Sequence, residues 1–325
     1  MAKPETLEPG KAHMVLKGKN DWLFLTNDSN HVIDQMTGQR PLAPEDVEAW
    51  RITLMLRRAW LESIGSRYIF AVAPNKEAVF KDHLPDGIRL SDNRPVRQLQ
   101  SAGIDLIYRP EKFRGAETYS KTDTHWNDLG GQRQAKMLLD ACRQQGVEVG
   151  PLSAMDIELI SQSHYGDLGR KLTPPQESEV ILKRVKSRQA KVVFSTKISN
   201  TGSILVFEGA DKSLPRGMFF ADSFGGVGSV SDFIAQGFSR LVVLWQPHFD
   251  FRLIEEEKPD IVISQMVERF LTLIPNDVRS EKLSAMSGFA EKWAEAKAAE
   301  AKTAEAAGPE KKKAAAAAPK QPSKT

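Results

Sequence analysis

Near-continuous apolar runs recur along the chain and are separated by segments in which apolar residues follow helical spacing. The runs occupy residues 68–72, 104–107, 203–207, 218–221, 241–245 and 260–264. Apolar runs without polar alternation are typical of strands that are buried on both faces of a parallel sheet. Helical segments between such strands cover the two faces. The pattern therefore predicts an α/β fold with three layers and a mostly parallel sheet.

Two helices stand out in this pattern. Residues 45–64 carry apolar side chains at helical spacing, and Gly65 follows them as a helix terminator. Residues 129–145 carry a second such pattern, for which one residue of the pair Asn127–Asp128 provides the N-cap. Cys142, the single cysteine, falls in the second helix, where we expect it to be buried or half-buried. One cysteine excludes an internal disulfide and a cysteine-rich metal site.

The two ends of the chain differ from the middle in composition. The polar N-terminal stretch predicts a flexible arm over residues 1–17, followed by one domain over residues 18–285. Residues 286–325 are rich in Ala, Lys and Glu, which favours a fragile helix up to Gly308 and a disordered segment beyond it. We interpret this tail as solvated, and a weak electrostatic tether to an anionic surface is the alternative.

The distribution of charge narrows the classes of partner. The chain has a formal net charge of +3, and the eight lysines and five glutamates of residues 287–325 account for it. The neutral body has no basic stripe with interleaved aromatic residues, so we expect no nucleic-acid partner. No stretch approaches the roughly 18 apolar residues of a membrane span, and the N-terminus lacks the apolar core of a secretory signal. As written, the chain is expected to be cytoplasmic.

One predicted strand leads directly into a serine. Chemistry in a parallel α/β sheet lies beyond the carboxyl ends of the strands. After residues 218–221 the sequence continues as Asp222-Ser223-Phe224-Gly225-Gly226. A serine in this place presents its hydroxyl above the sheet, and neighbouring backbone N–H groups, including that of Gly225, suit a developing oxyanion. A simple turn is the alternative interpretation.

Asp123 and His125 stand two residues apart in the segment 121–128. In an extended segment they project to the same side, so the carboxylate can reach the imidazole Nδ1. That contact fixes the tautomer of His125 and stabilises the imidazolium when the ring takes a proton. A helix-capping turn with a surface histidine is the alternative. A metal would find only two ligands in this motif, so we expect no metal.

Further residues near strand ends are weaker candidates. Asn75 can direct a side-chain N–H to an oxyanion, and Trp126, beside His125, is either a platform on which a substrate stacks or a core residue. Glu268 and Arg269 form either an ion pair that holds a helix to the sheet or, for Arg269, a contact with the substrate. His248 follows another strand and is a backup base. The remaining histidines are expected in the arm or in exposed polar loops: His13, His31, His83 and His164.

Six segments together form a recognisable pattern: GKNDWLFL (18–25), FAVAPNKEAVFKDHLP (70–85), YSKTDTHWNDLGG (119–131), YGDLG (165–169), MFFADSFGG (218–226) and KPDIVISQMVERFL (258–271). In this order they resemble the AlgX/AlgJ-type SGNH hydrolase-like domain of alginate O-acetyltransferases. The resemblance implies a flavodoxin-like SGNH core and a Ser-His-Asp triad whose Asp-x-His pair precedes the serine. Carried over to this chain, Ser223 matches the nucleophile, His125 the base and Asp123 the orienting carboxylate.

Members of this family move acetyl groups onto sugar hydroxyls of bacterial exopolysaccharides. They are exported or membrane-anchored and receive the acetyl group from a membrane-bound acyltransferase, so the resemblance offers a periplasmic location as the alternative. It implies an O-acetyltransferase that forms an acetyl-serine and needs no cofactor. If water accepts the acetyl group instead, the enzyme is a carbohydrate esterase. A non-catalytic carbohydrate-binding or assembly component of a polysaccharide biosynthesis complex is the remaining hypothesis.

Overall fold

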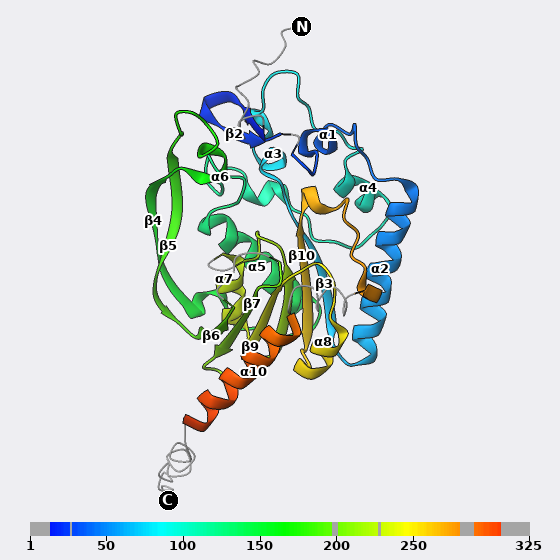
Figure 1. The fold of residues 1–325 in the computed structure, drawn as a ribbon, viewed down its shortest axis with the longest axis vertical. Coiled ribbons are helices and arrows are strands. Elements are labelled where there is room, and N and C mark those ends of the chain that lie inside the picture. Colours follow the sequence, from blue (N-terminus) through cyan, green and yellow to red (C-terminus); the bar gives the residue numbers. More distant parts are fainter. Residues whose placement is uncertain (1–13, 27, 197–200, 227–228, 280–288, 307–325) are drawn as a thin grey trace, which may run out of the picture.

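A six-stranded sheet forms the centre of the computed structural model, which describes residues 14–26, 28–196, 201–226, 229–279 and 289–306. The strand order is β3-β10-β8-β9-β7-β6 (Figure 1). The strands are β3 (Arg67–Ala73), β6 (Ala190–Ser195), β7 (Ile204–Gly209), β8 (Arg216–Ala221), β9 (Arg240–Trp245) and β10 (Ile261–Val267). The first four strands in this order are parallel, whereas β7 and β6 join antiparallel. The predicted α/β fold with a mostly parallel sheet is confirmed.

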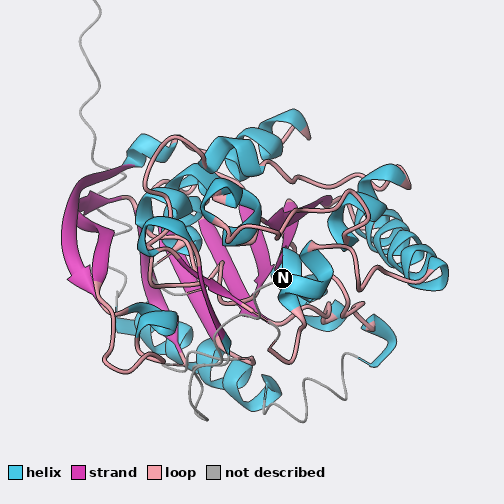
Figure 2. Ribbon diagram, turned by 90° about the horizontal axis from the view of Figure 1, so that it is seen from above, coloured by secondary structure: helices cyan, strands magenta, loops and turns pink. Residues whose placement is uncertain are grey.

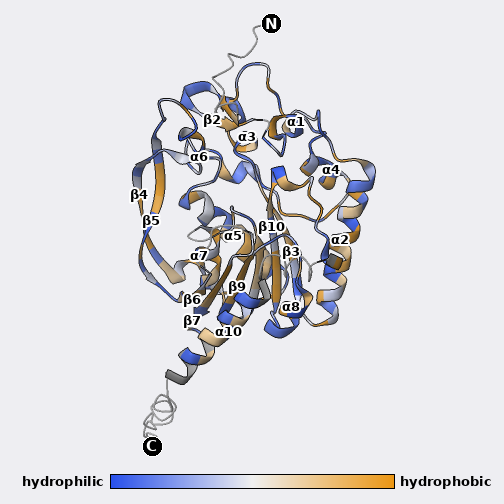
Figure 3. Cartoon of the chain, viewed as in Figure 1, coloured by the Kyte–Doolittle hydropathy of each residue, from blue (hydrophilic) through white to orange (hydrophobic). Residues whose placement is uncertain are grey.

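Helices cover both faces of the sheet and complete three layers (Figure 2). One face packs against α5 (Asp128–Gln144) and α7 (Val230–Ile234). The other packs against α2 (Pro44–Ser63), α4 (Pro95–Ser101), α8 (Phe251–Glu257) and α10 (Phe289–Ala306). Successive strand residues alternate between the two cores, so Ile69 belongs to the first and Phe70 to the second. Because both faces are covered, the central strands are apolar along their length (Figure 3).

Smaller elements surround this core. The short helices are α1 (Val32–Met36), α3 (Lys76–Val79) and α6 (Gly166–Gly169). Two antiparallel pairs stand outside the main sheet, β1 (Val15–Lys17) with β2 (Leu23–Leu25) and β4 (Met155–His164) with β5 (Ser178–Arg188). Single 3-10 turns occur at Lys19–Asp21, Lys81–His83, Pro110–Phe113, Leu152–Ala154, Ala235–Gly237, Glu268–Phe270 and Asp277–Arg279. Among the described helices, none combines the length and the hydrophobicity needed to cross a bilayer.

The two clearest helix predictions are confirmed, and local sequence explains both. Pro44 opens α2, where its missing N–H costs nothing, and Gly65 adopts a φ of 79° just beyond the helix end. Asn127 is the N-cap of α5, and its side chain accepts the Gly130 N–H at 3.1 Å. Cys142 is fully buried on this helix, and burial raises the pKa of its thiol to about 12.

One predicted strand and the length of the N-terminal arm need correction, and several strands were not predicted. Residues 104–107 form no strand; Ile107 makes one isolated bridge to Ala71 before the chain turns at Pro110. The arm expected over residues 1–17 ends earlier, because Val15–Lys17 pairs with β2; residues 1–13 lie outside the described part. The β4–β5 ribbon and β6 were not predicted. The ribbon stands apart from the central sheet (Figure 1), so its half-exposed strands carry many charged residues and lack an apolar run.

The alanine-rich helix near the C-terminus is part of the body. The predicted helix is found as α10, but Trp293 and Ala296 are buried against the α2 face of the sheet. The Trp293 indole N–H donates to Glu256 at 2.9 Å, and Lys297 forms an ion pair with Glu257. The interpretation as a solvated tail is therefore wrong for this helix, and the core extends past residue 285. Residues 307–325 lie outside the described part.

Candidate active site

The carboxyl ends of three parallel strands meet at one edge of the sheet. Ser223 follows β8, Lys76 follows β3 and Arg269 follows β10. The segment 119–127, which links a 3-10 turn to α5, lies beside the end of β8, since the indole N–H of Trp126 donates to the Phe224 carbonyl at 3.0 Å. This edge therefore carries the residues that the sequence singled out.

Ser223, His125 and Asp123 lie in one hydrogen-bonded chain. Ser223 Oγ is 2.9 Å from His125 Nε2, and His125 Nδ1 is 2.9 Å from Asp123 Oδ1. Asp123 Oδ1 also accepts the backbone N–H of His125 at 2.8 Å. The side chains of His125 and Asp123 remain partly accessible, with exposed fractions of 33% and 19%. Chemically, this arrangement can pass the serine proton to the imidazole while the carboxylate holds the ring.

The electrostatics of Asp123 suit the role of a permanent anion. Burial by itself would raise the pKa of its carboxyl, but the hydrogen bonds and the charge of His125 act in the opposite direction and prevail. The pKa of Asp123 is consequently held well below its usual range. A carboxylate that stays ionised stabilises the imidazolium formed when His125 accepts a proton.

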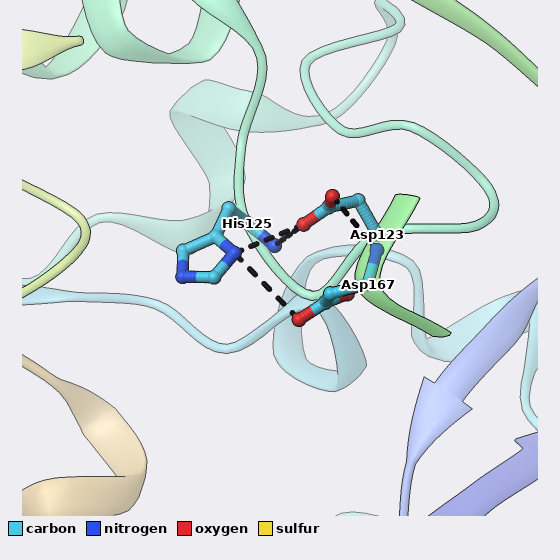
Figure 4. Close-up of side chains that lie close together, drawn as sticks. All are labelled: Asp123, His125 and Asp167. Carbon is cyan, nitrogen blue, oxygen red and sulfur yellow. Dashed lines mark hydrogen bonds and ion pairs between the residues drawn. The ribbon is translucent and has the colours of Figure 1, made fainter. Parts of the chain in front are cut away.

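Asp167 supplies a second carboxylate beside His125 (Figure 4). Its Oδ2 lies 3.8 Å from His125 Nδ1, and its two oxygens accept the Thr124 N–H at 2.7 Å and the Thr124 hydroxyl at 2.5 Å. The backbone N–H of Asp167 in turn donates to Asp123 Oδ2 at 3.1 Å. Sequence reasoning noted only a turn here. The segment YGDLG within the family pattern was the signal that could have found it.

Three potential metal ligands lie within 4.8 Å of one another, on Asp123, His125 and Asp167. This is one ligand more than the Asp-x-His motif offered in the sequence. The hydrogen bonds above already use all four carboxylate oxygens of Asp123 and Asp167, and the histidine also faces Ser223. We therefore interpret the cluster as a hydrogen-bonded network rather than as a metal centre.

Gly166 explains how Asp167 reaches this position. It adopts a φ of 63°, and a Cβ built there would lie 2.2 Å from the Thr122 carbonyl oxygen. The same carbonyl accepts the N–H groups of Leu168 and Gly169, both at 3.0 Å. Only glycine allows α6 to approach the 120–123 segment so closely.

A cavity of about 250 Å³ opens beside His125. Its walls come from the segment 120–128, from both strands of the β4–β5 ribbon and from the residue before α7: Ser120, Asp123, His125, Trp126, Asn127, Asp128, His164, Val180, Leu182 and Ser229. His164, which was expected in an exposed loop, ends β4 and places Nε2 3.7 Å from Asp123 Oδ2. The ribbon that the sequence did not predict thus forms part of the site.

The turn that carries Ser223 is tied to β10 by the residue before it. Asp222 is buried, and its oxygens accept the Phe224 N–H at 2.9 Å and the Val267 N–H at 2.6 Å. Burial raises the pKa of Asp222 in spite of these two hydrogen bonds. The backbone N–H groups of Ser223 and Gly226 donate to no acceptor among the described residues.

Three of the weaker candidates have structural roles instead. The Gly225 N–H donates to the Asp222 carbonyl at 3.0 Å, so it is not available to an oxyanion. Trp126 is 6% exposed and stacks on Phe113 with ring centroids 5.5 Å apart, so most of its ring packs in the core, although it also lines the cavity beside His125. Asn75 is 1% exposed and turns its amide nitrogen toward Met36, 3.6 Å from the sulfur, rather than toward a substrate.

The expected ion pair between Glu268 and Arg269 is absent from the described residues. Glu268 pairs instead with Arg94 at 3.0 Å and accepts the Tyr108 hydroxyl at 2.8 Å, in a buried network in which burial raises the pKa of Glu268. The Arg269 guanidinium lies 5.1 Å from each of two ring centroids, those of Phe224 and Phe270. Its side chain is left without a hydrogen bond among the described residues.

His248 does not serve the same site. Its Nδ1 accepts the Asn276 N–H at 2.9 Å, and burial lowers the pKa of its imidazole. His31 and His83 lie beside Asp34 and Asn20, whereas His13 is outside the described residues. His125 is therefore the histidine that the structure places against Ser223.

Comparison with known proteins places the chain in a known family. Residues 15–208 match the model of the SGNH hydrolase-like domain of the acetyltransferase AlgX. The chain is 27% identical over 165 residues to the probable alginate O-acetylase AlgJ of Pseudomonas putida, and 27% identical over 172 residues to that of Pseudomonas syringae. Each alignment covers 47% of this chain and 40% of the relative, so the match spans well under half of those proteins.

Solved structures share the fold. The O-acetyltransferase domain of Pseudomonas putida AlgJ matches with a TM-score of 0.53 and 16% identity, covering 81% of this chain and 94% of that one. Bacillus cereus PatB1 with a sulfonyl adduct matches with a TM-score of 0.54 and 15% identity, covering 79% and 95%. At these identities the likeness shows the three-layer SGNH-like fold.

Proposed function

Because this chain belongs to the family of SGNH hydrolase-like domains of AlgX-type acetyltransferases, we propose that it transfers an acetyl group to a sugar hydroxyl of a bacterial exopolysaccharide. The transfer proceeds through a covalent acetyl-serine at Ser223. The observation that carries the proposal is the continuous path from Ser223 Oγ through His125 to Asp123, with both contacts at 2.9 Å. The curated relatives, named as probable alginate O-acetylases, supply the choice of acyl group and acceptor.

The first half-reaction loads the enzyme. His125 Nε2 takes the hydroxyl proton of Ser223 as Oγ attacks the acetyl carbonyl carbon. The tetrahedral intermediate then collapses, the bond to the donor's oxygen or sulfur breaks, and the imidazolium returns its proton to that leaving group. Asp123, which stays ionised at neutral pH, holds the imidazolium in place throughout.

The developing oxyanion needs donors that are free before the reaction starts. The Ser223 N–H is free among the described residues, and so is the N–H of Gly226, the residue directly after Gly225. We assign the Ser223 N–H as the first donor and the Gly226 N–H as the second. This replaces the earlier candidates Asn75 and Gly225.

The second half-reaction needs room for a sugar on the open side of His125. The cavity bounded by the β4–β5 ribbon offers that room and a mixed set of hydroxyl, carboxylate and imidazole groups. His125 deprotonates the sugar hydroxyl, which attacks the acetyl-serine and regenerates the Ser223 hydroxyl. Arg269, stacked on the ring of Phe224 and without a hydrogen-bond partner among the described residues, is placed to contact an oxygen of the substrate.

A polysaccharide acceptor requires an acetyl donor that reaches the same site. We propose a membrane-bound acyltransferase as that partner, with the transfer taking place on the periplasmic side. The support is the resemblance to exported polysaccharide O-acetyltransferases and the family match.

Serine substitution tests the proposal directly. Ser223→Ala is expected to lower hydrolysis of p-nitrophenyl acetate by about 10³-fold or more with an unchanged melting temperature. A serine-directed phosphonate should add to Ser223 in the wild type, as read by peptide mass spectrometry, whereas His248→Ala should retain labelling. Unchanged turnover in Ser223→Ala would refute the proposal, and absence of both adduct and turnover in the wild type would favour a carbohydrate-binding component.

The acceptor decides between transferase and esterase. Because the His125 side chain is one-third exposed, water can reach the acetyl-serine, and an esterase is the second candidate. Incubation with an acetyl donor and an exopolysaccharide oligosaccharide should yield acetylated sugar by mass spectrometry. Release of acetate alone would identify an esterase.

A further inference from the structure

Lys76 is a buried cation at the start of α3, directly after β3. It is 1% exposed, and its Nζ lies 5.7 Å from the ring centroid of Trp22 and 5.5 Å from that of Phe24. Among the described residues no carboxylate oxygen comes within 4 Å of this nitrogen. An ammonium removed from water without a carboxylate partner is costly, so its hydrogen bonds must compensate.

All three donors of the Lys76 ammonium are directed at one segment. Nζ donates to the carbonyl oxygens of Ser120 at 3.2 Å, Lys121 at 3.0 Å and Asp123 at 2.6 Å. The remaining carbonyl of this segment, that of Thr122, accepts N–H groups from α6. Every carbonyl from 120 to 123 is thus satisfied by a donor from elsewhere in the fold.

This segment needs such donors because it forms neither helix nor strand. Residues 120–125 make only turns, bends and irregular backbone, so no regular ladder fixes them. Yet Asp123 must hold His125 Nδ1 at 2.9 Å while His125 Nε2 meets Ser223 Oγ at 2.9 Å. The Asp123 main chain is held by Lys76, and its side chain by His125 and Asp167.

We propose that Lys76 is a positioning residue for acyl transfer: its three N–H groups hold the 120–123 segment in the conformation that aligns Asp123 and His125 with Ser223. The inference rests on the proposed function, because only chemistry that uses these three side chains depends on that alignment. Lys76 touches neither the substrate nor the reacting atoms in this role.

The proposal has a pH signature. Burial lowers the pKa of Lys76 to about 8, against the opposing influence of the facing carboxylates Glu77, Asp123 and Asp167. Above that pH the neutral amine has two N–H donors for three carbonyls, so positioning is lost and turnover falls. The free energy of unfolding changes in the opposite direction. Between about pH 8 and the ordinary lysine pKa of 10.5, Lys76 is protonated in more of the unfolded than of the folded chains, so its contribution to the free energy of unfolding rises with pH.

Three variants of the full chain separate positioning from scaffolding. Lys76→Met should lower kcat for p-nitrophenyl acetate by about 10- to 100-fold while KM stays within about twofold, as expected for a displacement of roughly 1 Å. Lys76→Arg keeps the charge and should recover much of kcat at pH 7. Lys121→Met is the matched control, because it removes an equal charge from the 120–123 segment itself. Among the described residues the Lys121 Nζ donates to the Asn20 carbonyl alone, so kcat should stay within about twofold of wild type.

The pH profile gives the second measurement. Wild-type kcat should fall above about pH 8 with no parallel fall in melting temperature, whereas Lys76→Arg should keep its turnover to about pH 10 because a guanidinium stays protonated. An unchanged kcat in Lys76→Met, or coincident alkaline limbs in wild type and Lys76→Arg, would overturn the inference. If the variants do not fold, wild-type turnover that stays flat to pH 10 overturns it as well.

Labelling by the serine-directed phosphonate separates this inference from the proposed function. No labelling of the wild type at any pH would sink the acetyl-serine mechanism. Labelling of Ser223 at equal rates in wild type and Lys76→Met would sink only the role of Lys76.

Discussion

The two carboxylates that face His125 lead to a quantitative prediction. Asp123 Oδ1 lies 2.9 Å from Nδ1 and Asp167 Oδ2 lies 3.8 Å from it. With an effective dielectric constant of about 20, their attractions for an imidazolium are about 5.7 and about 4.4 kcal/mol. The difference, about 1.3 kcal/mol, corresponds to roughly a tenfold difference in rate. Both residues should therefore matter, with Asp123 the more important.

Hydrogen-bond geometry adds to this difference. An asparagine at position 167 can still accept the Thr124 N–H and donate to the Thr124 hydroxyl. An asparagine at position 123 must turn its amide nitrogen toward either His125 Nδ1 or the Asp167 N–H. In the first case the ring takes the tautomer with Nε2 protonated, which cannot accept the serine proton.

The assay is kcat/KM for p-nitrophenyl acetate at pH 7, with melting temperatures as the control for folding. Asp123→Asn is expected to lose about 10³- to 10⁴-fold, and Asp167→Asn at least tenfold less than that. The double variant should lose no less than Asp123→Asn. A loss in Asp167→Asn equal to or greater than that in Asp123→Asn would refute the assignment of Asp123 as the main partner of His125.

Three further predictions concern the framework of the site. Gly225→Ala should destabilise the Ser223 turn and lower turnover, because the new Cβ would lie 2.4 Å from that of Ala221. Gly226→Ala has its nearest contact at 3.5 Å and should leave the melting temperature and the phosphonate labelling near wild type. Equal behaviour of the two variants would contradict this packing. Trp293→Ala should lower the free energy of unfolding, measured by urea titration, by about 3–5 kcal/mol because the side chain is buried. Replacement of the exposed Glu295 by Ala should change it by less than about 0.5 kcal/mol. A negligible effect at Trp293 would show that α10 is not part of the core. The pKa of Asp123 is lower in the folded than in the unfolded chain, so its ionised carboxylate stabilises the fold above the unfolded pKa, and this contribution is lost as the pH falls below that value. Asp123→Asn should therefore flatten the acid limb of the stability curve measured by thermal melts. An unchanged acid limb would argue against the low pKa.

The sequence predicted the sheet well where strands are buried on both faces. Continuous apolar runs marked β3, β8, β9 and β10, because a strand between two helical layers needs apolar side chains in both directions. The β4–β5 ribbon has no such cover, so its alternating and charged residues resembled a loop. The strand expected at 104–107 failed for a related reason, since a short apolar run can pack without joining a ladder.

The local chemistry of the site was also visible in the sequence. Asp123 and His125 are two residues apart, and Ser223 follows a strand, so each motif could be found from neighbours along the chain. Asp167 and Lys76 could not be assigned in this way. Their roles depend on contacts with the 120–125 segment made across 40 or more positions.

The partners of charged residues were decided only by the tertiary structure. Glu268 and Arg269 are adjacent in sequence, yet Glu268 bonds Arg94, 174 positions away, and Arg269 stacks on aromatic rings. The hydrophobic pattern of a segment predicts its secondary structure and its buried face without reference to the rest of the chain, because burial follows from the period of the side chains. Hydrogen bonds and ion pairs act over a few ångströms between particular atoms, so only the folded chain selects which groups meet.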